Sequence, residues 1–351
     1  MSSVSASPRL ARFGRLDVYR RRMFMTGAVG PAVVLVILFI IYASVQPSAL
    51  TLTQFNTLTS EAAAVALAAA GGTLVVLVGG FDLSVGQVLS LINVMIATKV
   101  GASVGGQVLM IPMALGIGAA AGAINGVLVN FVRIPSIVAT LAMSFLWGGV
   151  ALLILPQPGG EVPVDFVLWF TGNLGGVIPT PLVMVLVVVA LWLVLKRTPL
   201  GRAIYAVGGD ADAAAANGVR VRATSMAAYT IAGLLYGLSG VFLTAQSASG
   251  DPGIGGPLLL SIFAAMVVGG AVFGGGKGDV VGSIIGAYIL YLIADVLFAI
   301  GVSSFYTNIF NGTVLLVAVV VGSLTGTRPW LKERIQRLRG RTAAPEPGDG
   351  P

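Results

Sequence analysis

The eight residues Gly79-Gly80-Phe81-Asp82-Leu83-Ser84-Val85-Gly86 interrupt two long apolar runs with glycines and one carboxylate. Residues 62–78 before this segment and residues 88–98 after it carry no charge. An ionised group in hydrocarbon costs at least about 2.5 kcal/mol, and broken backbone at membrane depth is tolerated only where protein or a water-filled cavity satisfies it. The segment therefore predicts one of two structures: a helix break that lines a path, or a tight turn at the cytoplasmic surface in which Asp82 caps the next helix.

Composition places the chain in a membrane. Of its 351 residues, 56% are hydrophobic and 9% are charged, and the mean hydropathy is +0.97, whereas soluble domains are roughly 45–50% apolar and about 25% charged. Apolar runs of about 20 residues, each enough to cross a bilayer, recur from Thr26 to Gly326. We predict an all-α, polytopic membrane helix bundle in contact with the lipid bilayer.

The positive charge is clustered, and the positions of the clusters indicate orientation. Seventeen of the 20 basic residues lie within residues 9–22, 196–222 and 328–341. Each cluster flanks an apolar run, as the lysines and arginines of cytoplasmic loops do. Because these positions are those of cytoplasmic membrane anchors, the net charge of +7 does not indicate a nucleic-acid partner.

The amino acids that the chain lacks restrict its chemistry. It contains no cysteine and no histidine, which excludes disulfides, thiolate metal sites and the commonest metal ligand and general base. We therefore expect neither a metal site nor a catalytic residue.

The apolar runs and the basic clusters together predict ten spans of about 20 residues with both termini in the cytoplasm. A basic tail (residues 1–23) precedes a transmembrane domain (residues 24–326), and a second tail (residues 327–351) follows it. The ten predicted spans cover residues 26–45, 61–79, 85–100, 108–131, 135–155, 182–195, 226–245, 258–273, 280–300 and 306–324. In this topology the segment at 159–181 lies outside and holds a short interfacial helix, Phe166 to Phe170.

Two further patterns in the sequence concern the packing of the spans and an internal repeat. Glycines four residues apart in three of the predicted spans favour close helix contact; they lie at Gly118-x3-Gly122-x3-Gly126, Gly233-x3-Gly237 and Gly282-x3-Gly286. Residues 78–86 also resemble residues 268–270 together with 273–282, a faint internal repeat of a kind common in transporters.

Residues 196–222 form the longest predicted cytoplasmic loop. Asp210 is a suitable N-cap, residues 211–216 are strong helix formers, and Asn217-Gly218 is a stop signal. We expect one short capped helix, which either docks in the groove of a partner or serves as a solvated connector.

Three parts of the sequence closely resemble the permease subunits of bacterial ABC importers for monosaccharides, of the ribose/xylose type. They are Phe55-Asn56-Thr57-Leu58, the run from Gly72 through Gly86, and the run from Thr198 to Asp210 with Ala213-Ala214 and Gly218-Val219. Residues 267–270 and 273–278 also follow the pattern, and the similarity extends over residues 55–324.

The resemblance implies a subunit of the bacterial inner membrane that pairs with a second permease copy to form the pathway. A cytoplasmic ATPase would drive the transport of a sugar delivered by a periplasmic binding protein. The family's coupling helix, which rests on the ATPase, corresponds to Gly209, Asp210, Ala213, Ala214 and Gly218. Phe81 replaces the usual isoleucine, Asp210 the usual asparagine, and Ala216-Asn217 the common Leu-Ser, so only the detailed contacts are in doubt.

The chain has no ATPase motif of its own. A phosphate-binding Walker motif needs a glycine six residues before Lys277, where Ala271 stands, and a serine or threonine where Gly278 stands. Energy must come from a partner ATPase, with ATP bound by the partner and no cofactor here, or from an ion gradient.

Two rival functions remain open on the residues alone. Asp295 is the only acidic residue clearly inside a predicted span, and a single carboxylate could serve an ion-coupled transporter; a passive channel would need selectivity rings that are not visible. The candidate polar residues of a pathway are Asn93, Asn125, Asp295 and Asn311. The asparagines, including Asn308, are better explained as interhelical hydrogen-bond partners than as ligands of an uncharged polyol.

Overall fold

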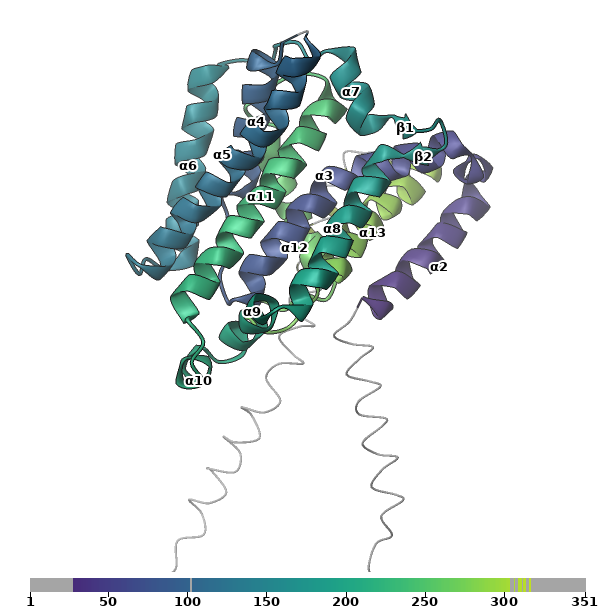
Figure 1. The fold of residues 1–351 in the computed structure, drawn as a ribbon. Coiled ribbons are helices and arrows are strands. Elements are labelled where there is room, and N and C mark those ends of the chain that lie inside the picture. Colours follow the sequence, from purple (N-terminus) through teal and green to yellow (C-terminus); the bar gives the residue numbers. More distant parts are fainter. Residues whose placement is uncertain are drawn as a thin grey trace, which may run out of the picture.

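A computed structural model describes residues 28–101 and 103–303, and the isolated residues 306, 309, 310, 312, 313 and 316. The described part is almost entirely helical (Figure 1). Its helices are α2 (Val29–Val45), η1 (Pro47–Leu50), α3 (Leu52–Leu77), α4 (Val85–Lys99), α5 (Val104–Asn130), α6 (Ser136–Ile154), α7 (Val164–Thr171), α8 (Thr180–Arg197), α9 (Pro199–Gly209), α10 (Ala211–Ala216), α11 (Val221–Ser247), α12 (Gly255–Val268) and α13 (Val280–Ala299). Strands β1 (Asn173–Leu174) and β2 (Ile178–Pro179) form a short antiparallel hairpin.

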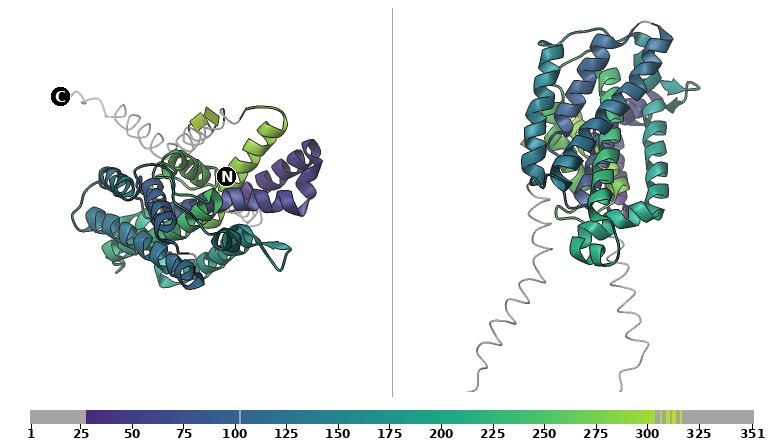
Figure 2. Two further views of the ribbon diagram at one scale, coloured as in Figure 1. Left: turned by 90° about the horizontal axis from the view of Figure 1, so that it is seen from above. Right: turned by 60° about the vertical axis from the view of Figure 1, so that its left-hand side comes forward.

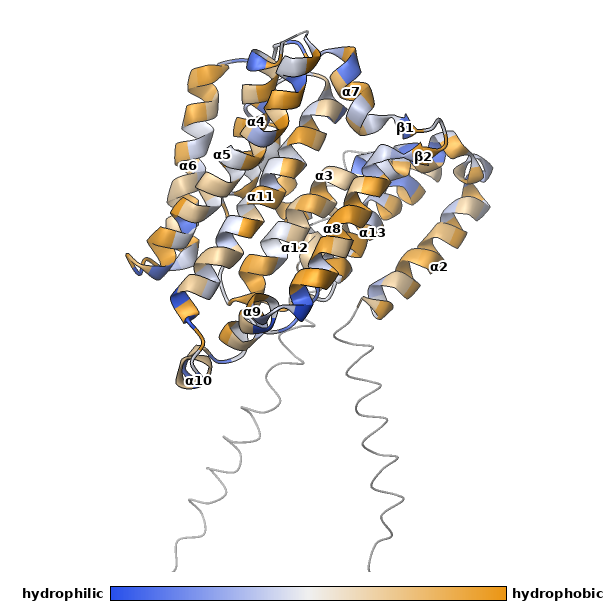
Figure 3. Ribbon diagram, in the orientation of Figure 1, coloured by the Kyte–Doolittle hydropathy of each residue, from blue (hydrophilic) through white to orange (hydrophobic). Residues whose placement is uncertain are grey.

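Length and hydropathy identify the helices that can cross a bilayer. In the described residues, six are long and apolar enough to span it, namely α3, α5, α6, α8, α11 and α13, and α2, α4 and α12 are shorter apolar helices. These nine match the first nine predicted spans, and most of the tenth lies outside the described residues. Hydrophobic residues predominate along most of these helices (Figure 3), and many large apolar side chains are exposed on α2, α6 and α8.

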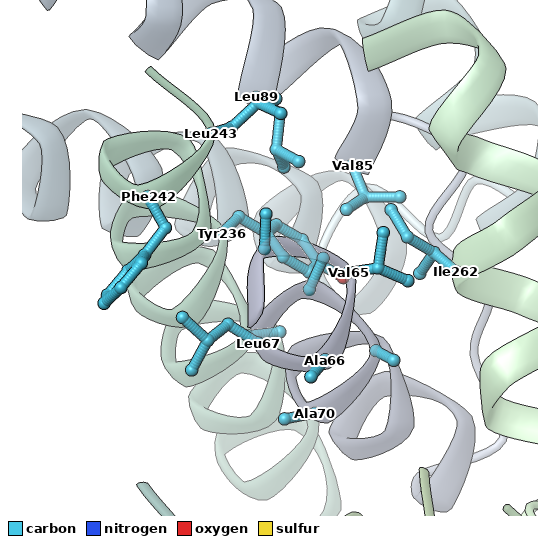
Figure 4. Close-up of a cluster of buried hydrophobic side chains, with 14 of the residues drawn as sticks. Val65, Ala66, Leu67, Ala70, Val85, Leu89, Tyr236, Phe242, Leu243 and Ile262 are labelled. Carbon is cyan, nitrogen blue, oxygen red and sulfur yellow. The ribbon is translucent and has the colours of Figure 1, made fainter. Parts of the chain in front are cut away.

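Helix α3 forms the centre of the bundle. Most of its side chains are buried, and it packs against α11, α13 and α12. Figure 4 shows Val65, Leu67 and their neighbours on α3 facing Tyr236 and Phe242 of α11 and Ile262 of α12. A helix that is apolar on all sides is buried in this way.

Small residues allow α5 and α11 to approach closely, as the glycine spacing predicts. A Cβ atom added at Gly118 would lie 2.1 Å from the carbonyl oxygen of Gly233, and one at Gly122 would lie 2.2 Å from that of Tyr229. Gly286 of α13 lies equally close to Ala265 of α12. Only hydrogen fits at these contacts, which is the physical basis of small-residue packing in membranes.

The faint sequence repeat corresponds to one local structure that occurs twice. Helix α3 ends with Gly79 at φ +84° and a hydrogen bond from Gly80 N to Val75 O of 2.9 Å. Helix α12 ends with Gly270 at φ +89° and a bond of 2.9 Å from the next backbone N–H to Met266 O. Both are glycine C-caps of the Schellman type, in which a left-handed glycine satisfies the last carbonyls.

An aspartate that accepts a hydrogen bond from the backbone two residues later precedes the next helix in both places, although only Asp279 is the N-cap of its helix and the N-cap of α4 is Ser84. The carboxylate of Asp82 accepts a hydrogen bond of 3.0 Å from Ser84 N, just before α4, and the carboxylate of Asp279 accepts one of 2.9 Å from Val281 N at the start of α13. Residues 78–84 and 269–279 are therefore equivalent interruptions, here called the first and second breaks.

Two predicted segments differ from the structure. Helix α3 begins at Leu52, nine residues before the predicted start at Glu61, because Thr51 caps it by accepting a hydrogen bond of 3.3 Å from Gln54 N. Glu61 therefore lies well inside a long helix. The prediction that Asp295 is the only acidic residue clearly inside a span is wrong.

The outer segment at 159–181 holds the predicted short helix, α7, with bounds three residues wider in total. Phe166 and Phe170 of α7 point into the bundle and are buried, and the ring of Phe170 lies 5.2 Å from that of Phe242. Only Trp169 of the three aromatics is substantially exposed. The hairpin after α7 was not predicted; Gly175 and Gly176, both at positive φ, form its turn.

Candidate functional site

The two ends of the bundle differ. Helices α9 and α10 lie at one end, called the α10 end, with the C-terminus of α8 and the N-termini of α11 and α13 (Figures 1 and 2). Helix α7 and the hairpin lie at the other, called the hairpin end. Of the described basic residues, all but Lys99 belong to segments at the α10 end: Arg133, Lys196, Arg197, Arg202, Arg220, Arg222 and Lys277.

Residues 196–222 contain two short helices, where one was predicted. The predicted helix is α10, and its N-cap Asp210 accepts hydrogen bonds from Asp212 N at 3.1 Å and Ala213 N at 3.0 Å. It ends at Gly218, with φ +82° and a hydrogen bond of 3.0 Å from Val219 N to Ala214 O. The predicted cap and stop residues are therefore confirmed.

The side chains of α10 divide unequally between bundle and solvent. Ala214 is 6% exposed and faces the bundle, whereas the other five residues of the helix are exposed, as are Gly209, Asp210 and Gly218. A substitution at Ala214 therefore perturbs internal packing, whereas Ala213 is one of the residues that a partner could reach.

Helix α9 was missed by the sequence analysis. Thr198 caps it by accepting a hydrogen bond of 3.2 Å from Gly201 N, and Pro199 occupies its first turn, a position that proline favours. Ile204 and Val207 are buried against the bundle. The apolar spacing of Leu200, Ile204 and Val207 is a helical period that could have revealed it.

The end of α9 touches both breaks through backbone atoms. A Cβ atom added at Gly208 would lie 1.7 Å from the carbonyl oxygen of Leu77, the last residue of α3, and 2.5 Å from Gly276 N. Gly276 N itself donates a hydrogen bond of 2.9 Å to Leu77 O. We call this meeting of Leu77, Gly208, Gly275 and Gly276 the backbone joint, since only main chain fits there.

Side chains of α8 and α9 also bind the second break, next to the backbone joint. Asp279 accepts a hydrogen bond of 3.0 Å from Trp192 Nε1 and pairs with Lys196 Nζ. Tyr205 Oη donates a bond of 2.9 Å to Gly278 O. Burial and the nearby Asp279 carboxylate raise the pKa of the Tyr205 phenol well above its usual range, so it remains a donor. Lys196 is 41% exposed, which limits what its ion pair contributes to stability.

Asp82 of the first break is buried, with 4% of its surface exposed. Besides Ser84 N, its carboxylate accepts hydrogen bonds from Ser84 Oγ at 2.6 Å and from Asn125 Nδ2 of α5 at 3.2 Å. Asn125 Nδ2 also donates to Ser84 Oγ at 2.8 Å. Asp82 is therefore buried inside the bundle, and the predicted capping of the next helix is wrong, because the N-cap of α4 is Ser84 and no side chain caps it.

The backbone of the first break is satisfied by neighbouring helices. Phe81 N donates to Ser136 Oγ at 3.2 Å and Leu83 N to Thr140 Oγ1 at 3.0 Å, both on α6, and Phe81 O accepts from Tyr229 Oη of α11 at 3.3 Å. Broken helix within a membrane bundle needs such partners.

Packing contacts surround the break. The rings of Phe81 and Phe273 lie 5.3 Å apart, so the two breaks touch. A Cβ atom at Gly80 would lie 2.4 Å from Tyr229 Oη, and one at Gly86 would lie 2.4 Å from Gly255 O. Gly79 needs its glycine for the positive φ instead, because nothing lies within 4 Å of an added Cβ atom.

The remaining candidate polar residues lie apart from the break. Asn93 of α4 is buried and bonds to the end of α11, donating to Ser249 O at 2.9 Å and accepting from Asp251 N at 2.6 Å. Asp295 is half-buried on α13 beside a cavity of about 160 Å³. Asn308 and Asn311 lie outside the described residues. Among those described, no group of three or more acidic residues is arranged to hold a metal ion.

Comparison with known proteins identifies the family. Residues 54–319 match the family described as "Branched-chain amino acid transport system / permease component". The chain is 36% identical to the ribose import permease protein RbsC of Escherichia coli over 294 residues, which cover 82% of this chain and 91% of the relative. It is 36% identical to that of Bacillus subtilis over 313 residues, covering 88% and 97%.

A third relative has a different named substrate. The autoinducer 2 import system permease protein LsrC of Yersinia enterocolitica is 32% identical over 316 residues, which cover 88% of this chain and 87% of the relative. No solved structure matches the chain. The chain therefore belongs to the permease family of binding-protein-dependent ABC importers, as a non-catalytic, multi-pass inner-membrane subunit whose partners are an ATPase that binds the ATP and a substrate-binding protein.

Proposed function

We propose that this permease forms the pathway for a monosaccharide or a related small polyol delivered by a periplasmic binding protein. The relatives named for ribose import support a sugar as substrate. The polar groups at the first break are an asparagine, hydroxyls and one carboxylate that is already hydrogen-bonded. The asparagine and the hydroxyls among them are neutral, and such groups suit an uncharged solute.

We further propose that α10 is the contact with the ATPase and that α9 transmits its movement to the membrane helices. The single observation that carries this proposal is the backbone joint, where Gly208 lies against Leu77 of α3 and Gly276 of the second break. Closure of the partner ATPases would push the exposed face of α10, tilt α9, and shift both breaks so that the transport pathway opens to the other side of the membrane.

Replacing Ala213 tests the coupling role. Ala213 is exposed on α10, so Ala213→Arg should leave insertion intact and abolish both uptake and substrate-stimulated ATP hydrolysis in proteoliposomes that contain the ATPase and the binding protein. Ala213→Ser, which keeps the residue small, is the matched control and should retain both activities. Normal uptake by the arginine variant would remove the coupling assignment.

The orientation is part of the same proposal: ten spans, both termini in the cytoplasm, and the α10 end inside. The concentration of basic residues at the α10 end supports it. Because the chain has no cysteine, a single cysteine at Ala213 can be probed with an impermeant maleimide in intact cells. Labelling before the cells are opened would refute the orientation.

The pathway is proposed to require two permease subunits, either two copies of this chain or this chain and a related one. Large apolar side chains remain exposed along α6 and α8, such as Leu153, Phe145 and Leu191, and such faces contact either lipid or a partner. Molecular mass measured for the complex assembled with its ATPase tests this step.

A further inference from the structure

A polar cavity lies at the hairpin end, away from both breaks. Its volume is about 330 Å³, within the range of small-molecule sites. It is an open depression between α3, α7 and the C-terminal end of α11. The lining residues are Asn56, Thr57, Ser60, Glu61, Val167, Thr171, Ala245, Gln246 and Ala248.

The lining presents several hydrogen-bonding groups beside apolar surface from Val167, Ala245 and Ala248. It combines two amides, three hydroxyls and the carboxylate of Glu61, and contains no lysine or arginine. An anionic solute would be repelled by that carboxylate and would find no cation to pair with. An uncharged molecule rich in hydroxyl groups matches donors and acceptors of this kind, since each hydroxyl both donates and accepts.

Several of these groups have weak or missing partners within the described residues. Asn56 Oδ1 is buried and accepts no hydrogen bond there. Its Nδ2 donates to Thr171 O over 3.4 Å, and Gln246 Nε2 donates to Ser60 O over 3.5 Å, distances beyond the usual range for such bonds. The Glu61 carboxylate has no hydrogen bond or ion pair in the described part of the chain. A buried acceptor without a donor is costly, and a ligand hydroxyl would supply one.

We propose that this cavity is an entry site of the permease for a monosaccharide, with Glu61, Asn56 and Gln246 binding its hydroxyl groups. The inference rests on the proposed function and names residues for it. Glu61 accepts two hydroxyl hydrogens, Asn56 Oδ1 accepts a third, and the amide of Gln246 turns from Ser60 O to the sugar. The cavity lies at the end where, in the proposed orientation, the binding protein releases its load.

The first arm of the test is uptake by the complete importer. Proteoliposomes containing the permease, its ATPase and its binding protein are supplied with labelled D-ribose, D-xylose or D-galactose. Glu61→Gln removes one charged acceptor and should lower uptake at limiting sugar by about tenfold or more. Asp165→Asn makes the same change on the exposed face of α7, outside the cavity lining, and should leave uptake unchanged.

The second arm detects occupancy directly. The natural chain has no cysteine, so Ser60→Cys gives a single thiol in the cavity and Asp165→Cys a single thiol outside it. The transported sugar should slow maleimide labelling of the first and not of the second, and a sugar that is not transported should protect neither.

The outcomes separate the two proposals. If the wild-type importer takes up no monosaccharide or small polyol, these three sugars included, the proposed function is wrong. If it takes up a sugar while Glu61→Gln behaves like Asp165→Asn, and the Ser60→Cys thiol labels at the same rate with and without that sugar, the entry site is wrong and the proposed function stands.

Discussion

Gly208→Ala is the sharpest perturbation of the backbone joint, because it adds one methyl group where only main chain fits. The new Cβ atom would lie 1.7 Å from Leu77 O and 2.5 Å from Gly276 N. Restoring ordinary contacts requires a shift on the order of 1.5–2 Å. Neither neighbour is a flexible side-chain end that could rotate away, so α9 has to move.

The size of the effect follows from two terms. Overpacking of a tight contact costs about 1–3 kcal/mol. Separating α9 from α3 also strains the Gly276 N to Leu77 O hydrogen bond, which is worth about 1 kcal/mol net. A total of about 2–4 kcal/mol changes the ratio of docked to undocked α9 by roughly thirty- to several-hundredfold.

The assay is sugar uptake per ATP hydrolysed by the assembled importer in proteoliposomes. Gly208→Ala should hydrolyse ATP while uptake falls at least tenfold, because the ATPase contact on α10 remains and the link to α3 is displaced. The control is Gly149→Ala on α6, where an added methyl group meets nothing within 4 Å. If the two variants transport sugar with equal coupling, the backbone joint does not transmit movement.

Three further changes test other contacts. Gly122→Ala places a Cβ atom 2.2 Å from a backbone oxygen of α11, and this overpacking costs about 1–3 kcal/mol, so the thermal unfolding temperature in detergent should fall. The control Gly116→Ala, which has open space around the added methyl group, should leave that temperature unchanged. Equal shifts for the two variants would contradict the packing argument. Asp279→Ala leaves a buried indole N–H on α8 without its acceptor, at a cost of about 1–3 kcal/mol, whereas Asp279→Asn keeps an acceptor, so a calorimetric scan should rank the alanine variant lower. Asp82→Ala should reduce uptake per folded transporter more than it reduces abundance; a loss of abundance alone would leave Asp82 a structural residue only.

The sequence predicted the helices well, because the bilayer imposes a length and an apolar composition on each of them. The breaks were also visible, since Gly79 and Gly270 mark positions where a helix must end with a left-handed residue. The first residues of helices were harder to predict. Thr51 caps α3 in a polar stretch that resembles a loop, and no hydrophobic signal marks that boundary.

The partners of each site residue could not be predicted. Nothing near Asp82 in sequence indicates that Asn125, 43 residues later, donates to it, because side-chain pairing depends on how the helices pack. The burial of Ala214 was equally hidden, since a run of alanines has no apolar periodicity to show which side faces inward. The cavity with Glu61 was missed because that residue was placed at the end of a span.

The backbone joint has one more consequence, which concerns timing. Gly208 is a single residue, yet it touches the last turn of α3 and, through Gly275 and Gly276, the loop that precedes α13. These two segments belong to different copies of the internal repeat. In the proposed coupling, a displacement of Gly208 reaches both breaks in the same step, so that α4 and α13 would shift together rather than one after the other.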